Sequence, residues 1–311
     1  MTAASLAHSP APSAPTEGAV RRKLILAAML WGGGFSAGRV AAESFTPLGA
    51  AAARYALAAA ILLWLARRAH GGLPRLSLRQ AAQTFVLGAT GVFAYNLFFF
   101  AALARMPASR TALFVALSPV AVALVGALWT RERLGARKWA GILAALVGAA
   151  ILASRGAPGA MLADVAASFG AGELFMLGAV AAWAAYTMVG RAALTGLTPL
   201  TATAYAAAWG FALLAATLAL SGAPALVGAP GAAAWLTVLF LAVGATVVPF
   251  VWYYEGVRAL GPTRAAAFGN LVPFFGVLFG VVLLGESLTP AMLAGGAMIV
   301  LGVWQTTRPP R

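Results

Sequence analysis

Long apolar stretches alternate with short polar ones along almost the whole chain. About 20 apolar residues in a helix cross the hydrocarbon core of a bilayer, which is about 30 Å thick. Ten stretches fit this requirement, at 24–42, 47–66, 81–104, 107–129, 138–153, 170–190, 199–220, 234–257, 265–284 and 291–307. The pattern predicts an all-α membrane protein with ten transmembrane helices.

Several of these stretches begin with residues that favour the start of a helix. A threonine that can cap the helix precedes a proline suited to the first turn at Thr46-Pro47, Thr198-Pro199 and Thr289-Pro290. Ser77 and Gln80 have the spacing of a capping box. These four helix starts are therefore predicted most sharply.

The chain contains an internal repeat. The segment WGGGFSAGRVAAESFTPL at 31–48 returns as WAAYTMVGRAALTGLTPL at 183–200, and further along a gapless shift aligns Arg110 with Arg264 and Pro119 with Pro273. Each copy holds five predicted helices, an odd number, so the second copy enters the membrane from the opposite side. We predict two five-helix halves, 21–154 and 170–307, that form an inverted-topology repeat joined by a linker at 155–169.

The two ends of the chain lie outside this repeat. Residues 1–20 are rich in Ala, Ser and Pro and are expected to form a disordered tail, and 308–311 form a short C-terminal tail. A basic cluster at 21–23 followed by an apolar run looks like a signal peptide. Because the same run carries the repeated pattern, we expect it to remain in the mature protein.

Composition and charge support a membrane location. Hydrophobic residues make up 62% of the chain and charged residues 9%, with a net charge of +14. If the N-terminus is cytoplasmic, all but five of the 21 lysines and arginines fall on the cytoplasmic side; the exceptions are Arg39, Arg54, Arg105, Arg110 and Arg155. This predicts a multi-pass protein of the bacterial inner membrane with both termini in the cytoplasm. Nucleic-acid binding is the weaker interpretation of the charge.

The residue types argue against several functions. The chain has no cysteine, and its two histidines, His8 and His70, lie outside the apolar stretches. A metal site, a cofactor or an enzymatic nucleophile–base pair within the membrane is therefore not expected. The chain also has no Walker-type phosphate loop, which argues against ATP-driven transport.

Two matching segments carry a family resemblance. SPVAVALVGALWTRERLGARKWAGILAALVGAAIL and VPFFGVLFGVVLLGESLTPAMLAGGAMIVLGVW each combine a proline-containing helix, a terminal glutamate and a glycine-rich helix. They resemble the tandem EamA domains of the drug/metabolite transporter superfamily, and the chain as a whole is similar to bacterial aromatic amino-acid exporters. The resemblance implies a ten-helix carrier with a central cavity lined mainly by the first, third, fourth, sixth, eighth and ninth helices.

Polar and aromatic residues near the middle of these helices are the candidates for substrate binding. They are Trp31, Phe35, Tyr95, Asn96, Phe99, Trp183, Tyr186, Thr187 and Asn270. Aromatic faces can hold an apolar ring, and a buried amide needs a polar partner. Packing between helices, or against lipid, is the alternative for each of them.

Two prolines and one arginine are further candidates. Pro119 and Pro273 occupy matching places in the two halves, where each removes a helical hydrogen bond, and we interpret them as gating hinges. Fixed kinks are the alternative. Arg54 is a candidate intramembrane charge that must pair with an acceptor such as Glu43, reach outward, or meet a substrate carboxylate.

These features together predict a transporter that exports or facilitates the movement of small metabolites, most of all amino acids, including aromatic ones. The expected mechanism is alternating access by a monomer, whose partners are its substrate and membrane lipid. A multidrug or organic-cation exporter of the same fold is the main alternative, since aromatic faces also attract cations. A channel is a further alternative.

Overall fold

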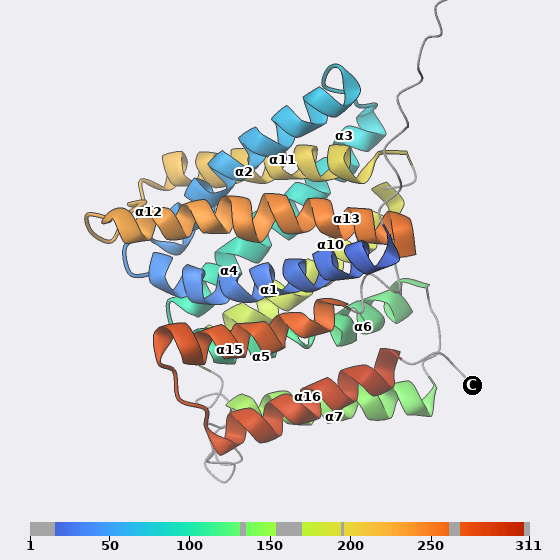
Figure 1. The fold of residues 1–311 in the computed structure, drawn as a ribbon, viewed down its shortest axis with the longest axis vertical. Coiled ribbons are helices and arrows are strands. Elements are labelled where there is room, and N and C mark those ends of the chain that lie inside the picture. The colour runs from blue at the N-terminus through green and yellow to red at the C-terminus, as the bar shows by residue number, and fades with distance from the viewer. Residues whose placement is uncertain (1–15, 131–134, 154–169, 194–195, 261–267, 308–311) are drawn as a thin grey trace, which may run out of the picture.

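The protein is a bundle of helices that run roughly side by side (Figure 1). The computed structural model describes residues 16–130, 135–153, 170–193, 196–260 and 268–307. The helices of the first part are α1 (Glu17–Ala41), α2 (Pro47–His70), α3 (Leu78–Leu87), η1 (Gly88–Ala94), α4 (Tyr95–Leu103), α5 (Ala108–Val115), α6 (Ser118–Thr130) and α7 (Ala136–Ala153). Those of the second part are α10 (Ala171–Ala193), α11 (Pro199–Ser221), α12 (Ala232–Leu239), η2 (Phe240–Val247), α13 (Val248–Leu260), η3 (Phe268–Leu271), α15 (Val272–Leu284) and α16 (Pro290–Thr307).

The helix starts with capping residues are confirmed. The hydroxyl of Thr46 accepts the N–H of Gly49 at 3.1 Å, and the hydroxyl of Thr198 accepts that of Thr201 at 3.3 Å. Thr289 does the same before α16, at 3.2 Å. Both hydrogen bonds of the capping box between Ser77 and Gln80 are present.

Other boundaries differ from the predicted ones. α1 begins at Glu17, inside the segment 1–20 that the composition assigned to a disordered tail, because the Thr16 hydroxyl caps the helix by accepting the N–H of Ala19. Its first turn also carries Glu17, a favourable charge there. α2 continues to His70 and ends where Gly71 adopts a left-handed conformation, with φ at 69°.

Four of the predicted helices are interrupted. The third and eighth each contain a π-helical stretch, η1 and η2, in which the hydrogen bonds span five residues instead of four. The fourth is split between α5 and α6 just before Pro119, and the described part of the ninth begins with the 3₁₀ turn η3 just before Pro273. Proline explains both breaks, since it has no N–H to continue the helical ladder.

Seven helical stretches of the described chain are long and apolar enough to cross a bilayer. They are 17–41, 47–70, 78–103, 108–128, 171–190, 199–221 and 232–253. The stretches 268–284 and 290–306 are apolar but shorter. A membrane protein built from helices is thus supported, while the full count of ten spans stays a prediction.

The helices pack in pairs that join distant parts of the sequence. α2 lies beside α11, α1 lies between α13 and α15, and α7 and α16 form a pair at one edge of the bundle (Figure 1). Glycines allow the last pair to approach closely, since a Cβ added to Gly148 would meet the carbonyl oxygen of Gly295 at 2.6 Å. The first residue of α1 and the last of α16 lie at the same end of the bundle (Figure 1).

Candidate functional site

Five aromatic side chains from three helices form a continuous chain inside the bundle. Phe35 of α1 meets Phe99 of α4 with ring centroids 5.4 Å apart, and Phe99 stacks on Tyr95 at 5.8 Å. Tyr95 in turn contacts Trp183 of α10 at 5.6 Å, and Trp183 contacts Tyr186 at 5.3 Å. The structure therefore brings together five of the residues that the sequence singled out.

Trp31 takes part in a different aromatic group. Its indole contacts Phe250 and Tyr253 of α13, each with ring centroids 5.7 Å apart. Trp31 and Trp183 occupy matching places in the sequence repeat, yet their rings contact different helices. Each repeat-related tryptophan thus belongs to its own cluster.

The remaining predicted polar residues differ in their surroundings. Asn96 is buried, with 1% of its surface exposed, and its amide donates to the carbonyl of Val92 at 2.7 Å. The hydroxyl of Thr187 donates to the carbonyl of Trp183 in its own helix at 2.8 Å. Asn270 lies exposed in the turn η3, so the expectation of a buried amide is wrong there.

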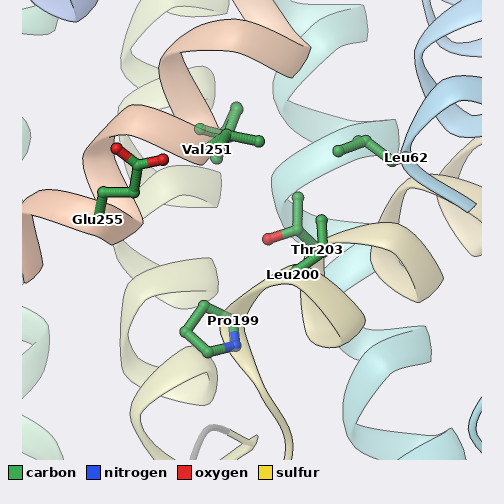
Figure 2. Close-up of a pocket in the computed structure, with 7 residues that line it drawn as sticks. Leu62, Pro199, Leu200, Thr203, Val251 and Glu255 are labelled. Atoms are coloured by element: carbon green, nitrogen blue, oxygen red, sulfur yellow. The ribbon is translucent and has the colours of Figure 1, made fainter. Parts of the chain in front are cut away.

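A pocket of about 200 Å³ opens between α2, α11 and α13 (Figure 2). Its lining residues are Leu62, Pro199, Leu200, Thr203, Phe250, Val251 and Glu255. Most of this wall is apolar, and Phe250 connects it to Trp31. Glu255 lies on one side of the pocket and Thr203 on the other (Figure 2).

The two polar groups of the pocket differ in their bonding. Glu255 forms an ion pair with Lys23 of α1, with Nζ and Oε2 2.6 Å apart, and both side chains are partly exposed. Thr203 is 7% exposed, and among the described residues its hydroxyl has no hydrogen-bond partner. A buried hydroxyl without a partner is unfavourable by about 1–3 kcal/mol.

Arg54 is buried two turns after the start of α2 and bonds only to neutral groups of the described chain. It is 8% exposed. Its Nε donates to the Thr246 hydroxyl at 2.9 Å, its Nη1 to the Asn96 carbonyl oxygen at 3.1 Å, and its Nη2 to the Ala245 carbonyl at 3.3 Å. Arg54 therefore does not pair with Glu43 and forms hydrogen bonds with other acceptors instead.

The local sequence of η2 and α13 explains how these acceptors arise. Pro249 has no N–H, so it cannot bond to the carbonyl of Ala245 four residues earlier. That carbonyl accepts from Arg54 instead. Thr246 donates its hydroxyl to Leu241 five residues before it, at 2.8 Å, which leaves the oxygen lone pairs free for the Arg54 Nε. Proline and π-helix together present oxygen atoms to the arginine.

Both predicted hinge prolines lie at a change of helix. Before Pro119, the N–H groups of Ala116 and Leu117 bond three residues back, to Leu113 and Phe114, in place of the α-helical pattern. Pro273 occupies the first turn of α15, directly after η3. The sequence thus located two irregular points in the bundle, and their role as gates stays a prediction.

The sequence interpretation missed the pocket and Pro249. The pairs Pro199 with Thr203 and Val251 with Glu255 are each four residues apart, which places each pair on one helix face. In each pair an apolar residue and a polar residue share one face near the end of a helix. This spacing was the signal that the sequence offered. For Pro249 the signal was a third proline inside an apolar stretch.

Comparison with known protein families decides the class. The model of the EamA-like transporter family matches residues 23–154 and again 170–308. The chain belongs to the EamA-like transporter family. It is therefore a multi-pass membrane transporter and not an enzyme, as the sequence resemblance implied. Among the described residues, no group of three or more His, Asp or Glu side chains could hold a metal ion.

Other proteins, among them transporters, match most of this chain. An uncharacterized transporter of Bacillus subtilis, YyaM, is 25% identical over 88% of this chain and 88% of its own length. A probable terminal-alkyne amino-acid exporter of Streptantibioticus cattleyicolor is 27% identical over 92% of each chain. A crystal structure with 23% identity superposes with a TM-score of 0.64, covering 94% of this chain and 98% of that one, which supports the fold.

Proposed function

We propose that this EamA-like transporter exports small metabolites, most of all amino acids, including aromatic ones, or facilitates their movement. The observation that carries the proposal is the pocket between α2, α11 and α13, where the apolar side chains of Leu62, Leu200 and Phe250 lie beside the carboxylate of Glu255 and the hydroxyl of Thr203. An amino acid combines an apolar side chain with polar groups at one end. The name of the Streptantibioticus relative, a probable amino-acid exporter, agrees with this substrate class.

The proposed mechanism is alternating access between two inverted five-helix halves that together supply ten transmembrane helices. Support comes from the two matches of the family model and from the packing of α1 against α13, which mirrors that of α10 against α4. Helix breaks before Pro119 and Pro273 fit the proposed gates. We further propose that both termini are cytoplasmic, that the protein lies in the inner membrane, and that a monomer is sufficient.

The proposed path for an aromatic substrate includes both aromatic groups. Phe250 lines the pocket and Trp31 packs edge-on against it, so Trp31 fixes the position of the pocket wall. The chain from Phe35 to Tyr186 offers further ring faces between α1, α4 and α10. Offset and edge-to-face ring contacts contribute about 0.5–1.5 kcal/mol each beyond burial, so a ligand ring can replace one such contact.

Uptake into liposomes tests this assignment. The purified protein is expected to take up labelled phenylalanine saturably, and Trp31→Ala and Trp183→Ala are each expected to reduce the flux several-fold. Trp139→Ala is the matched control, because this tryptophan is 47% exposed near the start of α7. Normal flux in both variants would show that the aromatic groups do not form the path.

An organic-cation exporter is the second candidate, favoured by one observation. Phe250 and Glu255 line the same pocket, where an aromatic face attracts cations and the Glu255 carboxylate already pairs with the cation of Lys23. If a quaternary ammonium compound enters the liposomes and aromatic amino acids neither enter nor compete, this candidate replaces the amino-acid assignment.

A further inference from the structure

Arg54 and Arg110 are equally buried but differently compensated. Each is 8% exposed. Arg110 pairs with the carboxylate of Glu173 at 2.6 Å, whereas Arg54 contacts an amide oxygen, a hydroxyl and a backbone carbonyl. Within the described part of the chain no carboxylate pairs with Arg54. Within the described chain its positive charge is compensated by these neutral groups and by the Tyr55 ring, whose centroid lies 5.4 Å from the guanidinium carbon.

Such an arrangement is costly inside a membrane and leaves binding capacity. A charged side chain at the centre of a bilayer is unfavourable and is normally compensated by a partner. A guanidinium group has five N–H donors, and three of them make the bonds described above. The other two make no hydrogen bond within the described chain.

In the second half of the repeat, the position equivalent to Arg54 carries no charge. A shift of 152 residues, which aligns Thr46-Pro47-Leu48 with Thr198-Pro199-Leu200, places Ala206 at the position of Arg54. Ala206 is buried in α11, and a Cβ added to Gly88 of η1 would meet its carbonyl oxygen at 2.7 Å. The equivalent helix of the second half, α11, therefore packs against the π-helix η1 with an alanine in the place of Arg54.

Arg54 lies on the same face of α2 as a residue of the pocket wall. Arg54, Ala58 and Leu62 are spaced four residues apart, so they share one face of α2, and Arg54 lies about 12 Å along the helix from Leu62 in the pocket wall. On the other side, Phe250 of the wall follows Thr246, the partner of Arg54, by one helical turn. Thr203, whose buried hydroxyl has no partner within the described chain, lines the same pocket (Figure 2).

We propose that Arg54 binds the carboxylate of the transported molecule, which reaches it from the pocket between α2, α11 and α13. The ligand class is an organic carboxylate with an apolar body. A carboxylate can accept two parallel N–H bonds from a guanidinium, and it neutralises the charge that Asn96 and Thr246 only solvate. The proposal rests on the proposed transport of amino acids and adds the residue that recognises their acid group.

Competition against labelled phenylalanine in liposomes tests the proposal first in the unaltered protein. 3-Phenylpropanoate keeps the carboxylate and lacks the amine, whereas phenethylamine keeps the amine and lacks the carboxylate. We expect 3-phenylpropanoate to inhibit uptake at a concentration at least about 10-fold lower than phenethylamine does, because hydrogen bonds to charged groups contribute about 1.5–3 kcal/mol. Equal inhibition by the two compounds would overturn the proposal.

Variants then assign the effect to Arg54. Arg54→Gln is expected to raise the half-saturation concentration for phenylalanine about 10-fold or more and to abolish the preference for 3-phenylpropanoate, while Arg54→Lys retains part of that preference. Arg110→Gln removes an equally buried arginine and is expected to lower stability without changing the preference. If Arg54→Gln does not fold, the Arg54→Lys variant and the competition in the unaltered protein decide.

The outcomes separate this proposal from the amino-acid assignment. Uptake of phenylalanine with an unchanged acid preference in Arg54→Gln would leave the assignment intact and refute the role of Arg54. If phenylalanine is not transported but labelled 3-phenylpropanoate is, and that uptake depends on Arg54, the amino-acid assignment fails and the carboxylate site stands. Uptake of organic cations alone would refute both.

Discussion

Glu286 provides a direct test of how the described structure is stabilised. It follows α15 after Gly285, whose φ is 66°, and its carboxylate accepts the N–H groups of Ala108 at 2.7 Å and Ser109 at 2.8 Å. These are the first two residues of α5, and the first N–H groups of a helix have no partner within it. Glu286 therefore caps a helix from the other half of the chain. A negative charge at this position is also favourable for the helix dipole.

The substitution Glu286→Gln keeps the size of the side chain and removes its charge and one acceptor oxygen. A hydrogen bond to a charged group contributes about 1.5–3 kcal/mol, and partial exposure reduces this value. We therefore expect the free energy of unfolding to fall by about 1–2 kcal/mol, which corresponds to a decrease of about 2–6 °C in melting temperature. Phenylalanine flux at low temperature should change little.

Thermal unfolding of the purified protein in detergent, followed by circular dichroism, measures this decrease. Glu43→Gln is the control, since Glu43 is an exposed carboxylate between α1 and α2. Gly280→Ala disturbs the same cap, because a Cβ at this position would meet Oε2 of Glu286 at 2.6 Å. The two changes combined should cost less than their sum. An unchanged melting temperature in Glu286→Gln, together with a flux that no longer responds to pH, would refute the capping role and favour proton coupling.

Three other predictions concern packing, energy coupling and topology. Gly148→Leu should separate α7 from α16 and greatly reduce the yield of folded protein, measured by size-exclusion chromatography, because the two helix backbones leave no room for a side chain there; a normal elution profile would contradict this. A proton ionophore should leave uptake into liposomes largely unchanged, since the described acids lie near helix ends; collapse of uptake would indicate proton coupling. A reporter that is active only in the cytoplasm should give a signal when it is fused to either end. A periplasmic signal from either end would refute the orientation.

The sequence predicts the helices well where a local signal exists. Threonine followed by proline defined the starts of α2, α11 and α16, because a hydroxyl cap and a fixed φ act within a few residues. The glycine run after Trp31 was harder to interpret. Its first member, Gly32, lies against α15, where an added Cβ would meet Phe275 at 2.5 Å. Only the packing of two distant segments reveals that contact.

The π-helical stretches and the pocket could not be predicted from local patterns. Hydrophobic periodicity does not distinguish four-residue from five-residue hydrogen bonding in a helix that is apolar all round, as η2 is between Phe240 and Val247. The pocket depends on three helices that are far apart in the sequence. For Arg54, the sequence indicated that an acceptor was needed but could not identify it, because Asn96 and Thr246 lie 42 and 192 residues away.

The positions where the two halves differ are more informative about chemistry than those where they agree. Matching prolines, glycines and caps define two similar sets of helices, and similar helices need similar packing. Arg54 departs from this pattern, since Ala206 takes its place in the second half, where packing alone is satisfied. A buried charge kept in one half is not explained by a fold that the other half achieves without it. Its partners in the described chain, Asn96, Thr246 and the Ala245 carbonyl, carry no negative charge, and the substrate carboxylate is the charged partner that we propose for it.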